Sequence, residues 1–404
     1  MGVRRNVLPR FLLLYGTLYG SFGVSSPFLP AFLAARGVGP EALGLLLGAG
    51  TAVRLLSAPF AGRLADVFGA FRLELALFAL AAAAASLLYL PTHNFWLLAF
   101  VNLTQAAMLA PLVPLADALA LSWSRSTTRG NSGAFEYGWV RGIGSAAFIA
   151  GVLVAGQSAA VWGLPSVLWL TTAGLFATAL STRFVPDLAP GANLTTQKRK
   201  VTEGDWLVLL RQPVFVRMVL AAALVIGSHA MHDAFAIIRW RDAGISPVVS
   251  SVLWSESVGA EVLVFVFLGP RLLNLLGRSG ALALGAGAAV TRWGVLAQTA
   301  DVNILALIEP LHGLTFALFH LGCMRIIADT IPSSLAGLAQ AFYGTVGIGG
   351  ATALTTILSG WLFSRLGSAG FWGMALLCCL AFPVIWSLHM ALSRDLRRST
   401  SRSA

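Results

Sequence analysis

The sequence predicts an all-α membrane protein, with twelve transmembrane helices arranged as two pseudo-symmetric six-helix bundles. Composition is the first observation behind this prediction: 57% of the 404 residues are hydrophobic and only 11% are charged, whereas a soluble domain carries about 25% charged residues. Internal repetition is the second, because Gly37-Val38-Gly39-Pro40 returns as Gly244-Ile245-Ser246-Pro247, 207 residues later. Together they indicate a duplicated chain embedded in a membrane.

Glycine, proline and charge clusters divide the first half into apolar runs, and each run has the roughly 20 residues that a transmembrane helix needs. The first break is Gly37–Pro40, and the second is the basic turn from Arg63 to Gly69. The predicted spans of this half lie near residues 8 to 34, 41 to 61, 73 to 91, 95 to 121, 136 to 159 and 163 to 184.

The second half repeats these breaks, since Arg271–Gly277 follows Arg63–Gly69 by 208 residues. Its predicted spans lie near residues 213 to 237, 247 to 268, 279 to 299, 303 to 326, 335 to 363 and 369 to 392. The long polar stretch between them is a linker. We therefore expect an N-terminal bundle over 1–185, a cytoplasmic linker over 186–212 and a C-terminal bundle over 213–404.

The net charge of +11 lies in short basic stretches between the apolar runs. There it suits anionic lipid headgroups, so the bilayer is the expected partner and nucleic acid is not. With the N-terminus inside, 20 of the 27 lysines and arginines fall in cytoplasmic segments. This asymmetry predicts a multi-pass protein with both termini in the cytoplasm.

Sequence motifs for catalysis and for cofactor binding are missing. The sequence contains no H-E-x-x-H, G-x-S-x-G or G-x-x-x-x-G-K, so we expect no catalytic residues, no cofactor and no ATP-driven motor. The three cysteines, Cys323, Cys378 and Cys379, lack C-x-x-C spacing, and no metal site is expected.

Duplication inside a membrane protein indicates a secondary transporter, because two similar bundles can rock and open one site to either side in turn. An ionisable residue within a span costs several kcal/mol unless it is paired, protonated or hydrated. Glu261 and Arg292 lie midway along their spans, and either a structural salt bridge or a role in proton coupling would explain them. Arg54 lies 207 residues before Glu261; anion binding and helix packing are both open for it.

Asp117 and Arg141 lie at similar depths near the inner ends of the fourth and fifth spans. A guanidinium stays charged and grips a carboxylate through two parallel hydrogen bonds. Arg141 is therefore the first candidate for holding an anionic substrate, and a gate formed with Asp117 is the structural alternative. His229 and His232, in the seventh span, extend this predicted substrate site.

The tenth span places Glu309, His312 and His320 on one helical face, with Phe316 between the histidines. Histidine titrates near neutral pH, and a neighbouring carboxylate tunes it for proton transfer. With Glu261 and Arg292 these residues form the predicted proton-coupling set. Simple hydrogen bonding of buried histidines is the alternative.

Parallel repeats of six spans are the plan of the major facilitator superfamily, which this chain resembles. The turn Gly62-x-x-x-Asp66-x-x-Gly69, with Arg63, is similar to the superfamily's signature gating loop between its second and third spans. Val67 stands where that signature usually has an arginine.

Longer strings in both halves resemble the phenylpropionate permease family of this superfamily. They are Pro111–Leu119, Glu136–Arg141 with Gly144-Ser145, Leu253–Ser255 with Ala260–Val262, Arg292–Gly294, and Leu311-His312 with Thr315-Phe316, His320 and Met324-Arg325. The resemblance implies proton-coupled uptake of a small, often aromatic, carboxylate, such as a 3-phenylpropionate-like acid, across a bacterial inner membrane. It also implies polar interior positions at Asp117, Arg141, Glu261, Arg292, His312 and His320. His232 and Asp233 stand where that family usually has aromatic residues.

Other functions on the same fold remain open. They are a proton-driven efflux antiporter, a nucleoside or sugar symporter, and a substrate-sensing receptor without transport. The expected partners are a small carboxylate and protons, and we expect a functional monomer.

Overall fold

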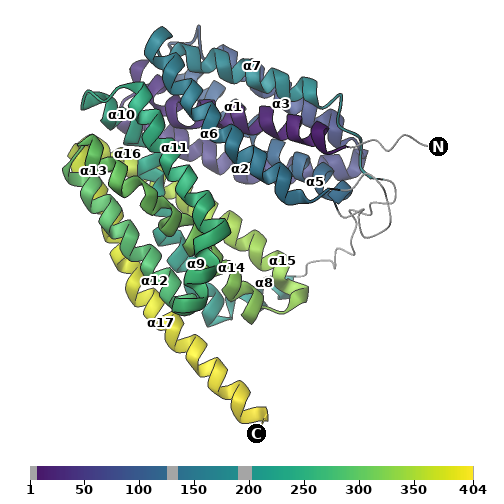
Figure 1. Cartoon of the computed structure of the whole chain (residues 1–404), viewed down its shortest axis with the longest axis vertical. Coiled ribbons are helices and arrows are strands. Elements are labelled where there is room, and N and C mark those ends of the chain that lie inside the picture. The colour runs from purple at the N-terminus through teal and green to yellow at the C-terminus, as the bar shows by residue number, and fades with distance from the viewer. Residues whose placement is uncertain (1–6, 125–134, 190–202, 404) are drawn as a thin grey trace. The chain divides into compact units, whose positions relative to one another are not determined.

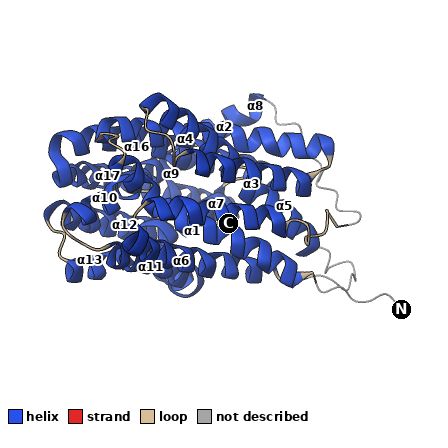
Figure 2. Ribbon diagram, turned by 90° about the horizontal axis from the view of Figure 1, so that it is seen from above, coloured by secondary structure: helices blue, strands red, loops and turns tan. Residues whose placement is uncertain are grey.

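The computed structural model describes residues 7–124, 135–189 and 203–403, and within these ranges the chain is helical with no strand (Figures 1 and 2). The all-α fold class predicted from composition is thus confirmed. The chain divides into two compact units. One comprises Met1–Gln197 with Trp240–Ser255, and the other comprises Lys198–Arg239 with Glu256–Ala404.

The first unit is built on helices α1 to α7. Their bounds are Leu8–Ala35 (α1), Pro40–Phe68 (α2), Phe71–Leu88 (α3), Phe95–Leu109 (α4), Leu112–Ser124 (α5), Tyr137–Trp162 (α6) and Pro165–Ser181 (α7). Helices α1 and α6 approach so closely that a Cβ on Gly23 would overlap the backbone carbonyl of Phe148. A Cβ on Gly151 would likewise meet the carbonyl of Gly20. Small residues allow such backbone contact, which is how helices associate where lipid removes the hydrophobic driving force.

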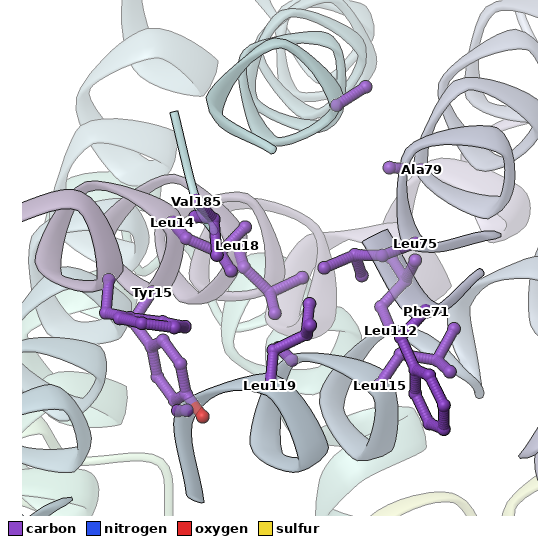
Figure 3. Close-up of a cluster of buried hydrophobic side chains, with 14 of the residues drawn as sticks. Leu14, Tyr15, Leu18, Phe71, Leu75, Ala79, Leu112, Leu115, Leu119 and Val185 are labelled. Atoms are coloured by element: carbon purple, nitrogen blue, oxygen red, sulfur yellow. The ribbon is translucent and has the colours of Figure 1, made fainter. Parts of the chain in front are cut away.

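A buried apolar cluster holds α1, α3 and α5 together. Figure 3 shows Leu18 of α1, Leu75 of α3 and Leu115 of α5 turned toward one another. These side chains are at most 1% exposed. Tyr15 belongs to the same cluster, and its hydroxyl donates a hydrogen bond to the carboxylate of Asp117.

The second unit contains more irregular helices. Their bounds are Glu203–Leu210 (α8), Pro213–Val225 (α9), Gly227–His229 (η2), Ala230–Asp242 (α10), Pro247–Leu263 (α11), Val264–Leu268 (η3), Gly269–Gln298 (α12), Val302–Ile308 (α13), Glu309–Leu311 (η4), Gly313–Leu318 (η5), Phe319–Thr330 (α14), Ser333–Phe342 (α15), Tyr343–Gly350 (η6), Ala351–Leu366 (α16), Gly367–Gly370 (η7) and Phe371–Ser403 (α17). The end of α10 and the start of α11 cluster with the first unit. Segments η3, η5 and η6 are π-helical, a geometry often found at functional sites.

Glycines with a positive φ recur at corresponding turns of the two repeats. Every described residue with a positive φ is a glycine, and these glycines form three pairs: Gly37 (86°) with Gly244 (82°), Gly69 (64°) with Gly277 (67°), and Gly163 (77°) with Gly367 (56°). Glycine reaches this region without the steric cost of a Cβ. The same local signals therefore end corresponding helices in each repeat.

Helix caps agree with this register. Asn94 caps α4 by accepting from the N–H groups of Trp96 and Leu97, and Asp301, 207 residues later, caps α13 through Asn303 and Ile304. Short polar side chains at this position satisfy N–H groups that a helix leaves open at its start.

Nine segments of the described residues are long and apolar enough to cross a membrane. The longest, Pro247–Gln298 and Ser333–Arg394, span 52 and 62 residues and are interrupted at Gly277 and Gly367. Helix α7 is apolar but shorter. The count of twelve spans stays a prediction.

Two predicted segments contain detail that the sequence did not predict. The predicted fourth span, 95 to 121, lies within the single apolar segment Phe95–Ser124. The helix breaks between the end of α4 at Leu109 and the start of α5 at Leu112, because Pro111 cannot donate a helical hydrogen bond. The predicted linker contains the helix α8, whereas its residues 190–202 lie outside the described part of the chain.

Candidate functional site

A buried ion pair lies in the second unit. Arg292 of α12 places Nη2 2.5 Å from Oε2 of Glu309 in η4, and both side chains are fully buried. Ser257 of α11 donates to the same oxygen at 2.5 Å. Breaking such a pair is costly because the remaining charge would be left unpaired away from water.

His232 of α10 joins this pair to an acidic residue on its own helix. Its Nε2 lies 3.3 Å from Oε1 of Glu309 and 3.3 Å from Nη2 of Arg292. Its Nδ1 lies 3.6 Å from Oδ1 of Asp233. The imidazole therefore lies between two carboxylates, one buried and one exposed.

His312 extends the network on the other side of Arg292. Nη1 of Arg292 lies 3.1 Å from Nδ1 of His312, and Nε2 of His312 lies 3.4 Å from Oε2 of Glu261. The ion pair of Arg292 is thus with Glu309, and Glu261 contacts the histidine. We refer to Asp233, His232, Glu309, Arg292, His312, Glu261 and Ser257 as the charged cluster.

Aromatic and hydroxyl groups fix the edges of the charged cluster. His229 lies 2.8 Å from the hydroxyl of Thr315 and its ring lies 5.1 Å from that of Trp293. The Arg292 guanidinium lies 4.8 Å from the Trp293 ring, and Trp293 donates to Ser228 at 2.8 Å. His229 is therefore held by uncharged partners.

The rings of the tenth predicted span stack in a row. His312 lies parallel to Phe316 at 5.6 Å, and Phe316 lies parallel to His320 at 6.3 Å. His320 also meets the Tyr343 hydroxyl at 3.0 Å. The π-helical segment η5 separates His312 from His320, and it places both histidines and Phe316 along one side.

A second polar group lies in the first unit, around Asp117 of α5. Its Oδ1 accepts hydrogen bonds from Tyr15 at 2.5 Å and from Tyr137 at 2.8 Å. Arg141 of α6 donates to the Tyr19 hydroxyl and lies over the Tyr19 ring at 5.4 Å. Arg141 remains exposed, so its other N–H groups stay open to a ligand.

Two positions of the charged cluster correspond to neutral amides in the first unit. Asn102 and Gln105 lie 207 residues before Glu309 and His312. The Tyr89 hydroxyl contacts Oδ1 of Asn102 at 3.1 Å and Oε1 of Gln105 at 3.2 Å, and Gln105 donates to Ser86 at 2.6 Å. The duplicated position thus carries amides in one repeat and titratable groups in the other.

Arg54 and the predicted gating loop both lie on α2. Arg54 is exposed. The loop assignment is corrected: Gly62, Arg63 and Asp66 belong to the last turns of α2, which continues to Phe68. Only Gly69 forms the turn, because its N–H bonds to the carbonyl of Ala65 and its φ is positive.

Sequence reasoning missed the tyrosines as site residues. The chain has five, and each one contacts a polar side chain: Tyr15, Tyr19, Tyr89, Tyr137 and Tyr343. The sequence did contain a signal, because tyrosine is scarce beside 24 phenylalanines. A buried phenol needs a hydrogen-bond partner, so each tyrosine that replaces a phenylalanine in an apolar chain indicates a polar contact.

Metal binding has no support among the described residues, where no cluster of three or more His, Cys, Asp or Glu side chains has suitable geometry. The charged cluster instead consists of ion pairs and hydrogen bonds. A helical, strongly apolar chain with such groups in its interior has the features of a multi-pass membrane transporter, because ionisable residues within spans mark substrate and ion pathways.

The chain belongs to the MFS_1 like family, whose model matches residues 8–374. It is 35% identical, over 93% of its length and 96% of the relative's, to a "Probable 3-phenylpropionic acid transporter" of Escherichia coli (strain K12). It is 23% identical to "Multidrug resistance protein 2" of Bacillus subtilis (strain 168), over 68% of this chain and 69% of that protein.

A solved structure shares the fold. The nucleoside transporter NupG matches with a TM-score of 0.82 over 96% of this chain and 99% of that chain, at 14% sequence identity. The family and fold expected from the sequence are confirmed by these findings.

Proposed function

We propose that this transporter is a proton-coupled symporter that imports a small aromatic carboxylate of the 3-phenylpropionate kind. The observation that carries the proposal is the charged cluster, in which two histidines and three carboxylates surround a buried arginine. Titratable groups that are expensive to bury and lie in contact can couple a proton to a conformational change. The name of the 35% identical relative supports the substrate class.

Arg141 holds the substrate carboxylate in this proposal. It is exposed and uses a hydrogen bond to Tyr19 for support, which leaves other N–H groups for a carboxylate. The proposed substrate-binding set is completed by Asp117, Arg54, His229 and His232. His312, His320 and Glu261 are the proposed proton carriers. The protein is proposed to be a monomer in a bacterial inner membrane, with both termini in the cytoplasm.

The experiment is uptake of radiolabelled 3-phenylpropionate into proteoliposomes with and without an inward proton gradient. Protein-free vesicles give the baseline, because a weak acid also crosses bilayers unaided. We expect saturable, protein-dependent uptake that is faster with the gradient and abolished by a protonophore. Protein-dependent uptake at one rate under both conditions would contradict proton coupling.

Substitution of Arg141 separately tests its proposed role in holding the substrate carboxylate. Lysine keeps the charge but loses the planar fork, so Arg141→Lys should raise KM at least about tenfold, or ~1.4 kcal/mol of binding. The exposed Arg211 at the end of α8 provides the control Arg211→Lys, whose KM should stay that of the wild type. An unchanged KM in Arg141→Lys would remove Arg141 from the substrate site.

Proton-driven export is the second candidate, favoured by the likeness to "Multidrug resistance protein 2". An exporter would expel preloaded 3-phenylpropionate when protons enter. If the same inward proton gradient instead drives 3-phenylpropionate to accumulate inside the vesicles, the protein is an importer.

A further inference from the structure

Asp233 has an environment unlike that of its neighbours on α10. Its side chain is 59% exposed, whereas every other residue from Val225 to Arg239 is buried. The adjacent His232 is only 5% exposed. A carboxylate within a membrane-spanning segment must be paired, protonated or hydrated, and an exposed side chain allows hydration. Asp233 is thus the only side chain from Val225 to Arg239 that is open to the surroundings of the protein.

His232 is placed to pass a proton inward from that point. Its two ring nitrogens contact different carboxylates: Nδ1 lies 3.6 Å from Asp233 and Nε2 lies 3.3 Å from Oε1 of Glu309. An imidazole can take a proton on one nitrogen and release another from the opposite one, which is the geometry of a proton shuttle.

Glu309 can receive that proton on an oxygen that neither Arg292 nor Ser257 contacts. Its two oxygens have separate partners, because Oε2 is held by Arg292 and Ser257 while Oε1 faces His232. Protonation at Oε1 therefore leaves both contacts to Oε2 in place. It neutralises the carboxylate, and the positive charge of Arg292 then acts on His312, 3.1 Å from Nη1.

We propose that Asp233 and His232 form the proton entrance of the charged cluster and deliver protons from water to Glu309. In one transfer, a hydronium ion protonates Asp233 and leaves water, the carboxyl group gives its proton to Nδ1 of His232, and Nε2 releases its own proton to Oε1 of Glu309. The imidazole ends neutral, as the other tautomer, and Glu309 ends as a carboxylic acid. This relay rests on the proposed function, because it assigns the route of the coupled proton.

The charged groups that face His232 are consistent with this direction. Asp233 attracts a proton from the exposed side and Glu309 from the buried side, whereas Arg292 opposes a lasting positive charge on the ring. His229 on the preceding turn, with His312 at a ring distance of 5.2 Å from it, adds further basic groups nearby.

The test separates net proton movement from substrate exchange. Proton-driven uptake of 3-phenylpropionate needs a proton to enter in each cycle, whereas counterflow exchanges labelled for unlabelled 3-phenylpropionate without net proton movement. We expect Asp233→Asn to slow proton-driven uptake more than tenfold while counterflow stays within about twofold of wild type, since an amide cannot take up and release the proton. Asp233→Glu should restore most of the uptake.

Asp242→Asn is the matched control, because Asp242 ends the same helix and is 60% exposed. It should leave both rates unchanged. Wild-type uptake in Asp233→Asn, or an equal loss of counterflow, would overturn the relay while leaving symport intact. A wild-type protein that ignores the proton gradient would overturn the proposed coupling itself, and the relay with it.

A measurement without substrate checks the final step. After an acid jump, an infrared carboxylic-acid band that is absent in Glu309→Gln reports protonation of Glu309. We expect this band to rise at least tenfold more slowly in Asp233→Asn. A band that rises at the wild-type rate would show that protons reach Glu309 by another route.

Discussion

At the scale of single residues, the structure shows how the charged side chains pair, whereas the sequence predicted only their depth along the membrane spans. Glu261 and Arg292 were matched because both lie midway along their spans, yet Arg292 bonds to Glu309 and Glu261 contacts His312. Depth along a helix is readable from sequence, but the direction in which a side chain points depends on packing and on helix irregularity. The 3-10 segment η4 and the π-helical segment η5 change the direction in which side chains of the tenth predicted span point. No sequence pattern predicted these segments.

Glu309→Gln tests the buried pair. Leaving Arg292 without its counter-charge should destabilise the protein by about 3–5 kcal/mol, measured as a large fall in Tm in detergent. Asp329→Asn is the control, because its pairs with Arg278 and Arg325 are partly exposed and should be worth about 1 kcal/mol or less. Equal effects of the two substitutions would contradict the buried pair's importance.

At the scale of helices, the sequence predicted most boundaries because glycine, proline and caps act locally. The turns at Gly37 and Gly244 illustrate this, since both glycines adopt the positive φ that their repeat position requires. The predicted loop begins too early for the opposite reason, whereas its gating role stays a prediction. Its motif resembles a turn, but α2 keeps its hydrogen bonds to Phe68, and only Gly69 leaves the helix.

Gly23→Ala tests the close contact of α1 with α6. The new methyl group would overlap the backbone of Phe148, so we expect a loss of about 1–3 kcal/mol and a lower Tm. Gly16→Ala is the matched control on the same helix, because nothing lies within 4 Å of its Cβ position. There alanine should be neutral or stabilising by up to about 1 kcal/mol. The reverse order of stabilities would contradict the described packing.

At the scale of the whole molecule, composition and repetition were enough for the fold class, and the family was predicted from the resemblance of strings in both halves. They did not predict that the two repeats carry different chemistry at matching positions. Asn102 and Glu309 follow equivalent helix caps, but one lies in an amide network and the other in the charged cluster. Duplication preserves backbone geometry through turns and caps, whereas side chains at the same positions diverge without disturbing it.

Membrane topology provides the prediction at this scale. With both termini inside, cysteines at His93 and Asn303 should react with an impermeant maleimide added to intact cells, and cysteines at Val67 and Asn274 should not. All four positions are exposed. The background lacks Cys323, Cys378 and Cys379, and labelling of opened membranes verifies that each new thiol is reactive. Labelling of Val67 or Asn274 from outside would contradict the predicted orientation.

The distribution of tyrosine has a practical consequence. The five phenol groups lie at three places: beside Asp117 and Arg141, in the amide network of Asn102, and beside His320. Fluorine-labelled tyrosine would therefore place a magnetic-resonance reporter at each of these three places and nowhere else. One isotopically simple sample could then follow both repeats at once, through a spectrum of five lines, as ligand and acidity are varied.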